Sequence, residues 1–115
     1  SGSARVSGDA RVYGDAWVSG SAQVRGDARV YDPRHILVVG PIGSEGVTST
    51  LHRTTTGHEL HVGCWHNGTL DTLPAEVERR SKHWEGIDAQ KQAWHEQYDA
   101  LRRLGRATVA QWVDA

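Results

Sequence analysis

Residues 4–31 read ARVSGD ARVYGD AWVSGS AQVRGD ARVY, which is one six-residue phrase repeated with little variation. Each phrase places alanine and valine two positions apart, and a glycine followed by Asp or Ser comes next in the first four. Residues two apart in an extended chain point to the same side, so the Ala and Val side chains form one apolar face. Glycine followed by Asp or Ser is typical of a turn. A fixed short period of this kind predicts a solenoid.

The phrase resembles the hexapeptide repeat of the left-handed parallel β-helix, and the resemblance covers residues 4–31. It implies a three-sided coil of eighteen residues, so residues eighteen apart are expected to stack. Arg11 then lies over Arg29, and Tyr13 lies over Tyr31. One interpretation of this face is a solvated surface on which like side chains stack from coil to coil, as in any solenoid. The other is an oligomer contact or a stacking strip for a ligand, based on the planarity of Arg and Tyr.

The repeat ends at Pro33, because proline cannot donate to a ladder of hydrogen bonds. Five phrases make fewer than two coils, whereas solenoids usually need at least about three repeats and capped ends. We therefore expect a β-helix domain over residues 1–33, truncated inside a longer array, and a capping or binding module over residues 34–115. Hexapeptide β-helices are commonly trimers, so the resemblance also implies a homotrimer.

The second module has the pattern of a small α+β unit. The apolar run 35–39 and the alternating stretches 47–53 and 59–65 predict three strands of an antiparallel meander. Pro74 suits the first turn of a helix, and a second amphipathic helix begins near Asp88. The predicted fold class is therefore mainly β plus α+β: a short left-handed parallel β-helix, then a β-meander with two C-terminal helices.

A second resemblance covers three motifs, VVGPIGS at 38–44, GCW at 63–65 and GTLDTLPAEV at 68–77. Following hexapeptide repeats, they resemble a C-terminal domain of uncharacterised phage and prophage proteins, which has a GPIGS loop, a Gly-Cys-aromatic strand and a helix led by Gly-Thr. This resemblance implies a phage or mobile-element setting and brings no assigned activity.

The GPIGSEG loop is the first candidate site. A glycine-rich loop after a buried strand can present backbone amides to an anion. It is not a Walker A motif, because no Gly-Lys-Ser/Thr follows, and it is not a dinucleotide-binding fingerprint, because a strand follows it and not a helix. The predicted ligand-binding residues are Gly40, Gly43, Ser44, Thr48 and Arg53. The alternative interpretation is a purely structural hairpin loop.

Cys64 and the nearby His58, His61 and His66 are the second candidate. Zinc sites use about four ligands in paired spacings, which this pattern does not offer, so the sequence predicts no metal site and no cofactor. A Cys64–His66 dyad is one interpretation, but strand alternation places Cys64 on the apolar face and favours a buried, inert thiol. The basic cluster at 78–83 is balanced by acidic neighbours and predicts a solvated helix face.

Composition excludes several function classes. The 115-residue chain has a net charge of −1 and a pI near 6.6, which makes nucleic-acid binding unlikely as a role. No apolar run reaches the length of a membrane span, so we expect no membrane partner. A single cysteine allows no internal disulfide.

These observations favour a non-catalytic, oligomeric β-helix scaffold that presents a small binding module, as a phage or prophage accessory or assembly protein. It would act in the host cytoplasm or on the virion, with a host protein or a small anionic ligand as partner. One alternative is sequestration of that anionic ligand, such as a nucleotide. The other is a hexapeptide-type acyltransferase, although the repeat contains no loop excursion and no histidine, and His35 lies just outside it.

Overall fold

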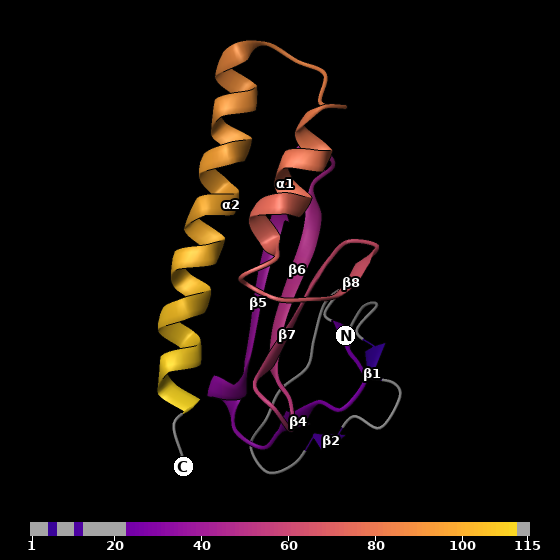
Figure 1. Cartoon of the computed structure of the whole chain (residues 1–115), viewed down its shortest axis with the longest axis vertical. Coiled ribbons are helices and arrows are strands. Elements are labelled where there is room, and N and C mark those ends of the chain that lie inside the picture. Colours follow the sequence, from indigo (N-terminus) through magenta and orange to yellow (C-terminus); the bar gives the residue numbers. More distant parts are fainter. Residues whose placement is uncertain (1–4, 7–10, 13–22, 113–115) are drawn as a thin grey trace.

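An antiparallel sheet of four strands forms the centre of the protein (Figure 1). The computed structural model describes residues 5–6, 11–12 and 23–112. Within them the central strands are β5 (Ile36–Ile42), β6 (Val47–Arg53), β7 (His58–Val62) and β8 (Trp65–Gly68). Each strand pairs with the next one along the chain, so the sheet is a simple meander. Only short hairpin connections are needed for such an order.

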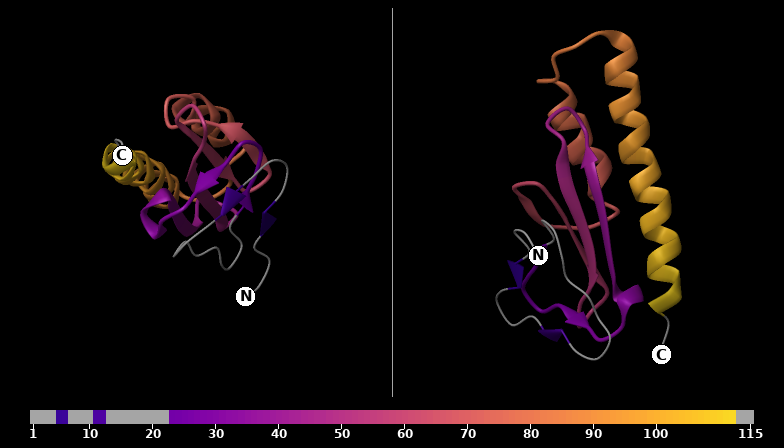
Figure 2. Two further views of the ribbon diagram at one scale, coloured as in Figure 1. Left: turned by 90° about the horizontal axis from the view of Figure 1, so that it is seen from below. Right: turned by 180° about the vertical axis from the view of Figure 1, so that it is seen from behind.

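Two helices follow the sheet, α1 (Leu73–Ser81) and the longer α2 (Asp88–Val109). Figure 1 and the rear view in Figure 2 show α2 running alongside β5 for most of its length, with α1 near one end of the sheet. The main hydrophobic core lies between this sheet face and the helices. Its buried residues are Ile42, Leu51, Leu60, Val62, Leu70, Leu73, Val77, Trp84, Tyr98 and Leu101. Burial of each large side chain contributes about 1.5–3 kcal/mol relative to exposure.

The opposite face of the sheet is polar and is covered by residues 23–31. Alternation along β6 sends Leu51 to the helix side and the buried Thr50 and His52 to this second face. The backbone N–H of Gln23 donates to Thr50 Oγ1 at 3.0 Å, and Ala28 forms an isolated bridge with Thr54. A small second core of Val24, Ala28 and Val30, with Ile36 beside it, closes this side.

The predicted left-handed parallel β-helix is wrong. The described part of the repeat contains β1 (Arg5–Val6), β2 (Arg11–Val12), β3 (Gln23–Val24) and β4 (Arg29–Val30), each only two residues long. They form two separate parallel pairs, β1 with β3 and β2 with β4. The pairs keep the eighteen-residue spacing of the sequence, but the described residues build no β-helix or solenoid, and the main sheet is antiparallel.

The physical reason lies in what Val24 and Val30 pack against. Fewer than two coils bury little apolar surface among themselves, because each repeat of a solenoid is stabilised mainly by its neighbours. The side chains of Val24 and Val30 are fully buried beneath the sheet, where β3 and β4 both contact β6. The antiparallel module therefore supplies the partner that further coils would otherwise provide.

The C-terminal module has one more strand than the pattern of residues 59–65 predicts. Strand β7 ends before Gly63, whose φ is 60°, and the chain turns there and runs back as β8. Val62 consequently faces Trp65 across a tight turn. Two short 3-10 helices flank the module: η1 (Pro33–His35) precedes the sheet, and η2 (Ala110–Trp112) ends the described chain.

The long helix α2 is amphipathic and is not a membrane span. It buries Tyr98, Leu101, Gly105 and Thr108 and exposes charged residues elsewhere. Within the described ranges, no helix combines the length and the apolar composition that crossing a bilayer requires.

Candidate functional site

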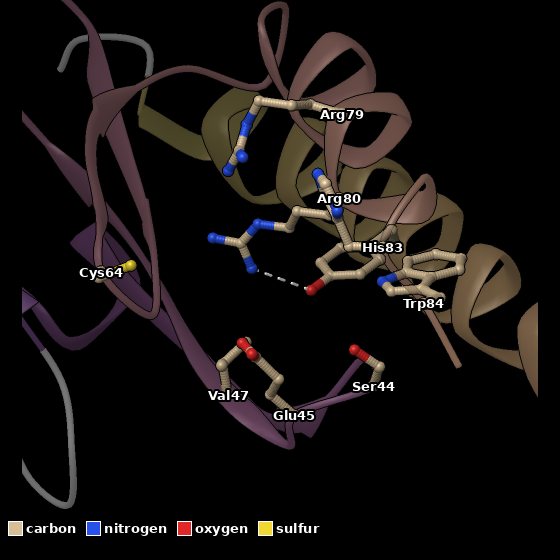
Figure 3. Close-up of a pocket in the computed structure, with 9 residues that line it drawn as sticks. Ser44, Glu45, Val47, Cys64, Arg79, Arg80, His83 and Trp84 are labelled. Carbon is tan, nitrogen blue, oxygen red and sulfur yellow. Dashed lines mark hydrogen bonds between the residues drawn. The ribbon is translucent and has the colours of Figure 1, made fainter. Parts of the chain in front are cut away.

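A cavity of about 260 Å³ lies where the β5–β6 turn, the β7–β8 turn and the end of α1 meet. Figure 3 shows its lining: Ser44 and Glu45 come from the β5–β6 turn, and two arginines of α1 face them. Trp84 and Tyr98 line the aromatic end. The site therefore combines a polar wall, a cationic wall and an aromatic end.

The turn wall is shaped by two glycines in the left-handed region, Gly43 with φ 76° and Gly46 with φ 62°. The N–H of Gly46 donates to the carbonyl of Gly43 at 3.3 Å, which closes the turn. The N–H of Gly43 donates to Gln97 Oε1 of α2 at 2.8 Å. This amide is thus engaged in anchoring the turn to the helix, and the exposed Ser44 and Glu45 are the polar groups offered to a ligand.

The cationic wall is organised by Glu76, whose residue is only 8% exposed. Arg79 donates to Glu76 through Nε at 3.0 Å and through Nη2 at 2.7 Å, and Arg80 Nε donates at 2.7 Å. These hydrogen bonds hold the pKa of Glu76 below its ordinary value, and the bonds from Arg79 make the largest contribution. One carboxylate facing two guanidinium groups leaves a net positive charge on this wall, opposite the carboxylate of Glu45 on the turn wall.

Arg80 is held further by the sheet and by α2. Its Nη2 donates to the carbonyl of Val62 at 2.7 Å, and its Nη1 donates to the Tyr98 hydroxyl at 3.3 Å. Its side chain is 14% exposed, whereas that of Arg79 is 63% exposed. Arg80 is therefore a fixed part of the wall, and Arg79 is the cation that can reorient toward a ligand.

The aromatic end is rigid because its rings pack on one another. Trp84 lies parallel to Tyr98, with centroids 6.4 Å apart and planes at 10°. Trp94 and His95 meet Trp84 edge-on at 5.5 and 4.8 Å. Burial, the largest cause, raises the pKa of Tyr98, so its hydroxyl stays protonated at neutral pH.

Cys64 lies in the β7–β8 turn and is exposed, so the expectation of a buried thiol is wrong. The break at Gly63 removes Cys64 from the strand alternation that would have turned it inward. Within residues 23–112, no hydrogen bond joins Cys64 to a histidine, and Figure 3 shows Cys64 across the cavity from His83. The cavity therefore presents a thiol without an adjacent general base.

The predicted loop residues separate into two groups. Gly43 belongs to the cavity turn and Ser44 lines the cavity. Gly40 packs against Thr48, where a Cβ at position 40 would lie 2.9 Å from the Thr48 Cα, so this pair holds the hairpin together. Arg53 is at the far end of β6, about 20 Å along the strand at about 3.3 Å per residue. The structure does not bring Arg53 to the loop.

Arg53 instead meets the predicted stacking face. Its Nε donates to the carbonyl of Arg29 at 3.0 Å, and its guanidinium lies 5.2 Å from the centroid of the Tyr31 ring. Arg11 and Arg29 are partners in the β2–β4 register. Tyr13 lies outside the described residues. One face of Tyr31 is therefore covered by Arg53.

The sequence pattern did not single out Arg79 and Arg80, which it assigned to a solvated helix face. Their spacing from Glu76, three and four residues, was the available signal, because such residues are neighbours on a helix. That signal predicts an ion pair, but not the turn that faces it across the cavity.

The role of the cavity is inferred from the residues that line it, because the comparisons with known proteins supply no relative. No family model, curated protein or solved structure matches this chain. The resemblance of residues 36 to about 112, loose after residue 77, to a phage-type domain therefore stays a prediction from sequence.

A second polar cluster, His52, Glu59 and His61, lies on the other face of the sheet. The Nε2 atoms of the two histidines are 2.9 Å apart, and both rings are almost fully buried. Burial is the main cause that lowers the pKa of His52 and lowers that of His61 to about 3, so both are neutral at pH 7. Burial also raises the pKa of Glu59.

Proposed function

We propose that this chain is a non-catalytic binding module that holds a small anionic ligand, such as a nucleotide, in the cavity between the β5–β6 turn and α1. The observation that carries the proposal is the pair of arginines fixed by the buried Glu76. Guanidinium groups recognise phosphate and carboxylate oxygens with two parallel hydrogen bonds. Arg79 is exposed enough to turn one such edge toward a ligand.

The size and polarity of the cavity limit which ligands it can hold. Ligand pockets for drug-sized molecules usually enclose about 300–1,000 Å³, and this cavity, at about 260 Å³, fits a molecule no larger than a mononucleotide. Glu45 on the turn wall disfavours negative charge there and accepts hydrogen bonds from amino or hydroxyl groups. The anionic group is thus expected against Arg79, with a neutral polar group toward Glu45.

The same lining supports binding more than catalysis. Cys64 has no hydrogen-bonded base among the described residues, so it lacks the partner that activates a catalytic thiol. No observation favours the acyltransferase alternative. The phage-type resemblance motivates ligand sequestration in a host cell or on a virion, and the homotrimer stays a prediction.

Calorimetric and thermal-shift titrations with a panel of purine and pyrimidine mononucleotides, and with pyrophosphate as an anion-only probe, test this function. We expect at least one mononucleotide to bind, and Arg79→Ala to weaken it about tenfold or more, because hydrogen bonds to charged groups contribute about 1.5–3 kcal/mol. Ser44→Ala should weaken it less, since it removes one neutral hydroxyl.

The matched control is Arg103→Ala, which removes an exposed arginine of α2 that does not line the cavity. It should bind like the unmodified chain. Absence of binding by every member of the panel, or equal losses in the two arginine variants, would contradict the proposed function.

A further inference from the structure

The cluster on the second sheet face is built by the register of β6 and β7. His52 lies directly opposite Glu59, and His61 is two residues further along β7, so the three side chains project from the same face. Their ligand atoms all lie within 4.8 Å of one another. The spacing of these three residues in the sequence matches no metal-binding motif, but the sheet register brings their side chains together.

Glu59 is the member of the cluster whose local contacts are incomplete. Its Oε1 is buried, has no hydrogen-bond partner among the described residues, and lies 3.8 and 4.0 Å from the Nε2 atoms of His52 and His61. Gly26 lies on its other side, where a Cβ would be 3.3 Å from Oε1. A buried carboxylate oxygen without a partner is costly, so an additional positive group at this point would be strongly favoured.

We propose that His52, Glu59 and His61 form a binding site for one divalent transition-metal ion, with Zn²⁺ as the expected occupant. Two imidazole nitrogens with one carboxylate suit Zn²⁺, Co²⁺ or Ni²⁺ better than Mg²⁺ or Ca²⁺, which prefer oxygen ligands throughout. Three protein ligands leave one position of a tetrahedral ion for water. This site is separate from the cavity and does not depend on the function proposed for it.

The distances need only small adjustments. A tetrahedral ion with bonds of about 2.0–2.1 Å holds its ligand atoms about 3.3 Å apart. The histidine nitrogens, at 2.9 Å, must separate slightly, and the Glu59 oxygen, at 3.8 and 4.0 Å from them, must approach by about 0.5–0.7 Å. The side chain of Glu59 is 24% exposed and is the movable ligand of the three.

The tautomers of the two histidines make the proposal specific. His52 Nδ1 faces the carbonyl of Arg53 at 3.1 Å, so it carries a proton and leaves the lone pair of Nε2 free to bind the ion. His61 Nδ1 accepts the N–H of Asn67 at 3.2 Å, so without an ion His61 carries its proton on Nε2 and donates it to His52. Binding must move that proton from Nε2 to Nδ1 and break the bond from Asn67.

Asn67 can yield to this change. It is exposed and belongs to β8, the edge strand of the sheet, so water can replace His61 as the hydrogen-bond partner of its N–H. The backbone N–H of Arg25, 3.5 Å from His52 Nε2, must also move aside. The ion would then link the neighbouring strands β6 and β7 through side chains on one face of the sheet.

Titration of the tag-free chain with Zn²⁺ and with Co²⁺ tests the site. We expect one ion per chain, visible absorption bands of tetrahedral Co²⁺, and a higher melting temperature with Zn²⁺. In nitrogen-15 NMR spectra, His61 should change from the Nε2–H to the Nδ1–H tautomer, and the Asn67 amide should shift. Surface adsorption of metal would not cause this pair of changes.

Glu59→Gln keeps the shape of the side chain, removes its charge, and should weaken Zn²⁺ binding about tenfold or more. His95→Asn, which changes a histidine on the helix side of the sheet, should leave binding unaltered. Because a His61 variant could fail to fold, the NMR tautomer of the unmodified chain provides a second, independent measurement. No saturable binding, unchanged affinity in Glu59→Gln, or an unchanged His61 tautomer at saturation would overturn the proposal.

Discussion

Glu76 shows how one buried side chain can prepare a surface site. It lies in the first turn of α1, where the helix dipole favours a negative charge, and it accepts hydrogen bonds from Arg79 and Arg80. Without it, the two guanidinium groups would repel each other and Arg80 would be left poorly compensated. The residue therefore acts on both stability and the position of the cationic wall.

Replacement of Glu76 by Gln should lower the free energy of unfolding at pH 7 by about 1.5–3 kcal/mol, the usual value of hydrogen bonds to charged groups. Most of this loss should come from the contact with Arg80, because Arg79 is largely exposed and screened by solvent. Urea denaturation followed by tryptophan fluorescence measures the difference.

The same variant has a distinct pH signature. The folded-state pKa of Glu76 is below its ordinary value of 4.5, so its stabilisation is present above pH 4.5 and is lost as the pH falls through the folded-state pKa. Between pH 5 and pH 3 the unmodified protein should therefore lose stability more steeply than Glu76→Gln. His61 has a folded-state pKa of about 3, below its ordinary value of 6.5, so it also lowers the stability as the pH falls below 6.5. This second loss is the same in the unmodified protein and in Glu76→Gln. Parallel stability curves would contradict the role assigned to Glu76.

At the scale of elements, the β5–β6 hairpin is fitted to α2 through a glycine. A Cβ at Gly43 would lie 2.5 Å from the Tyr98 hydroxyl, closer than a Cβ normally comes to another atom, and a tight 3.1 Å from its ring, so Tyr98 would have to shift. Gly46, in the same turn and with a similar positive φ, has only the Pro41 Cβ nearby, at 3.5 Å. Substitution at either glycine strains the backbone, but only substitution at Gly43 also causes a clash with Tyr98, so a comparison of the two isolates the effect of packing.

Gly43→Ala should destabilise the protein by about 1–3 kcal/mol more than Gly46→Ala, because both variants strain the backbone but only the first overpacks the contact with Tyr98. Thermal or urea unfolding of the two variants, measured side by side, gives the comparison. Equal losses would show that the hairpin does not rest on Tyr98 and that the turn wall of the cavity is mobile.

Local patterns in the sequence could predict most elements of the C-terminal module. Alternation identified the stretch that forms β6, and Pro74 lies in the first turn of α1. The break between β7 and β8 was missed because it depends on a positive φ at Gly63, which no alternation pattern reveals. The β-helix prediction failed for a non-local reason, since Val24 and Val30 found a partner in β6 and not in further coils.

The candidate site was harder to predict, because register and packing assemble both polar clusters. Ser44 could be named from the glycine-rich loop, but Arg79 reaches the same cavity only through the packing of α1 on the sheet. His52 and His61 are nine positions apart and become neighbours through the pairing of β6 with β7. Spacing in the sequence therefore excluded a metal site that the sheet register makes possible.

At the scale of the whole molecule, one sheet separates two apolar cores of unequal size. The larger core lies under the helices and contains Trp84, and the smaller one lies under residues 23–31 and contains Val24, Ala28 and Val30. Both cores depend on the same strand, because alternate residues of β6 face opposite sides. The structure therefore implies that loss of the small core destabilises the large one.

Val30→Ala tests this coupling. Removal of two buried methyl groups, at about 0.8 kcal/mol each, should lower stability by about 1.6 kcal/mol. If both sides of the sheet unfold together, urea unfolding monitored by tryptophan fluorescence on the helix side should report the whole loss. The control is Val38→Ala in β5, whose side chain is 42% exposed and should matter much less. A fluorescence transition that stays in place while the amides of residues 23–31 lose hydrogen-exchange protection would show that this segment unfolds independently of the sheet and its helices.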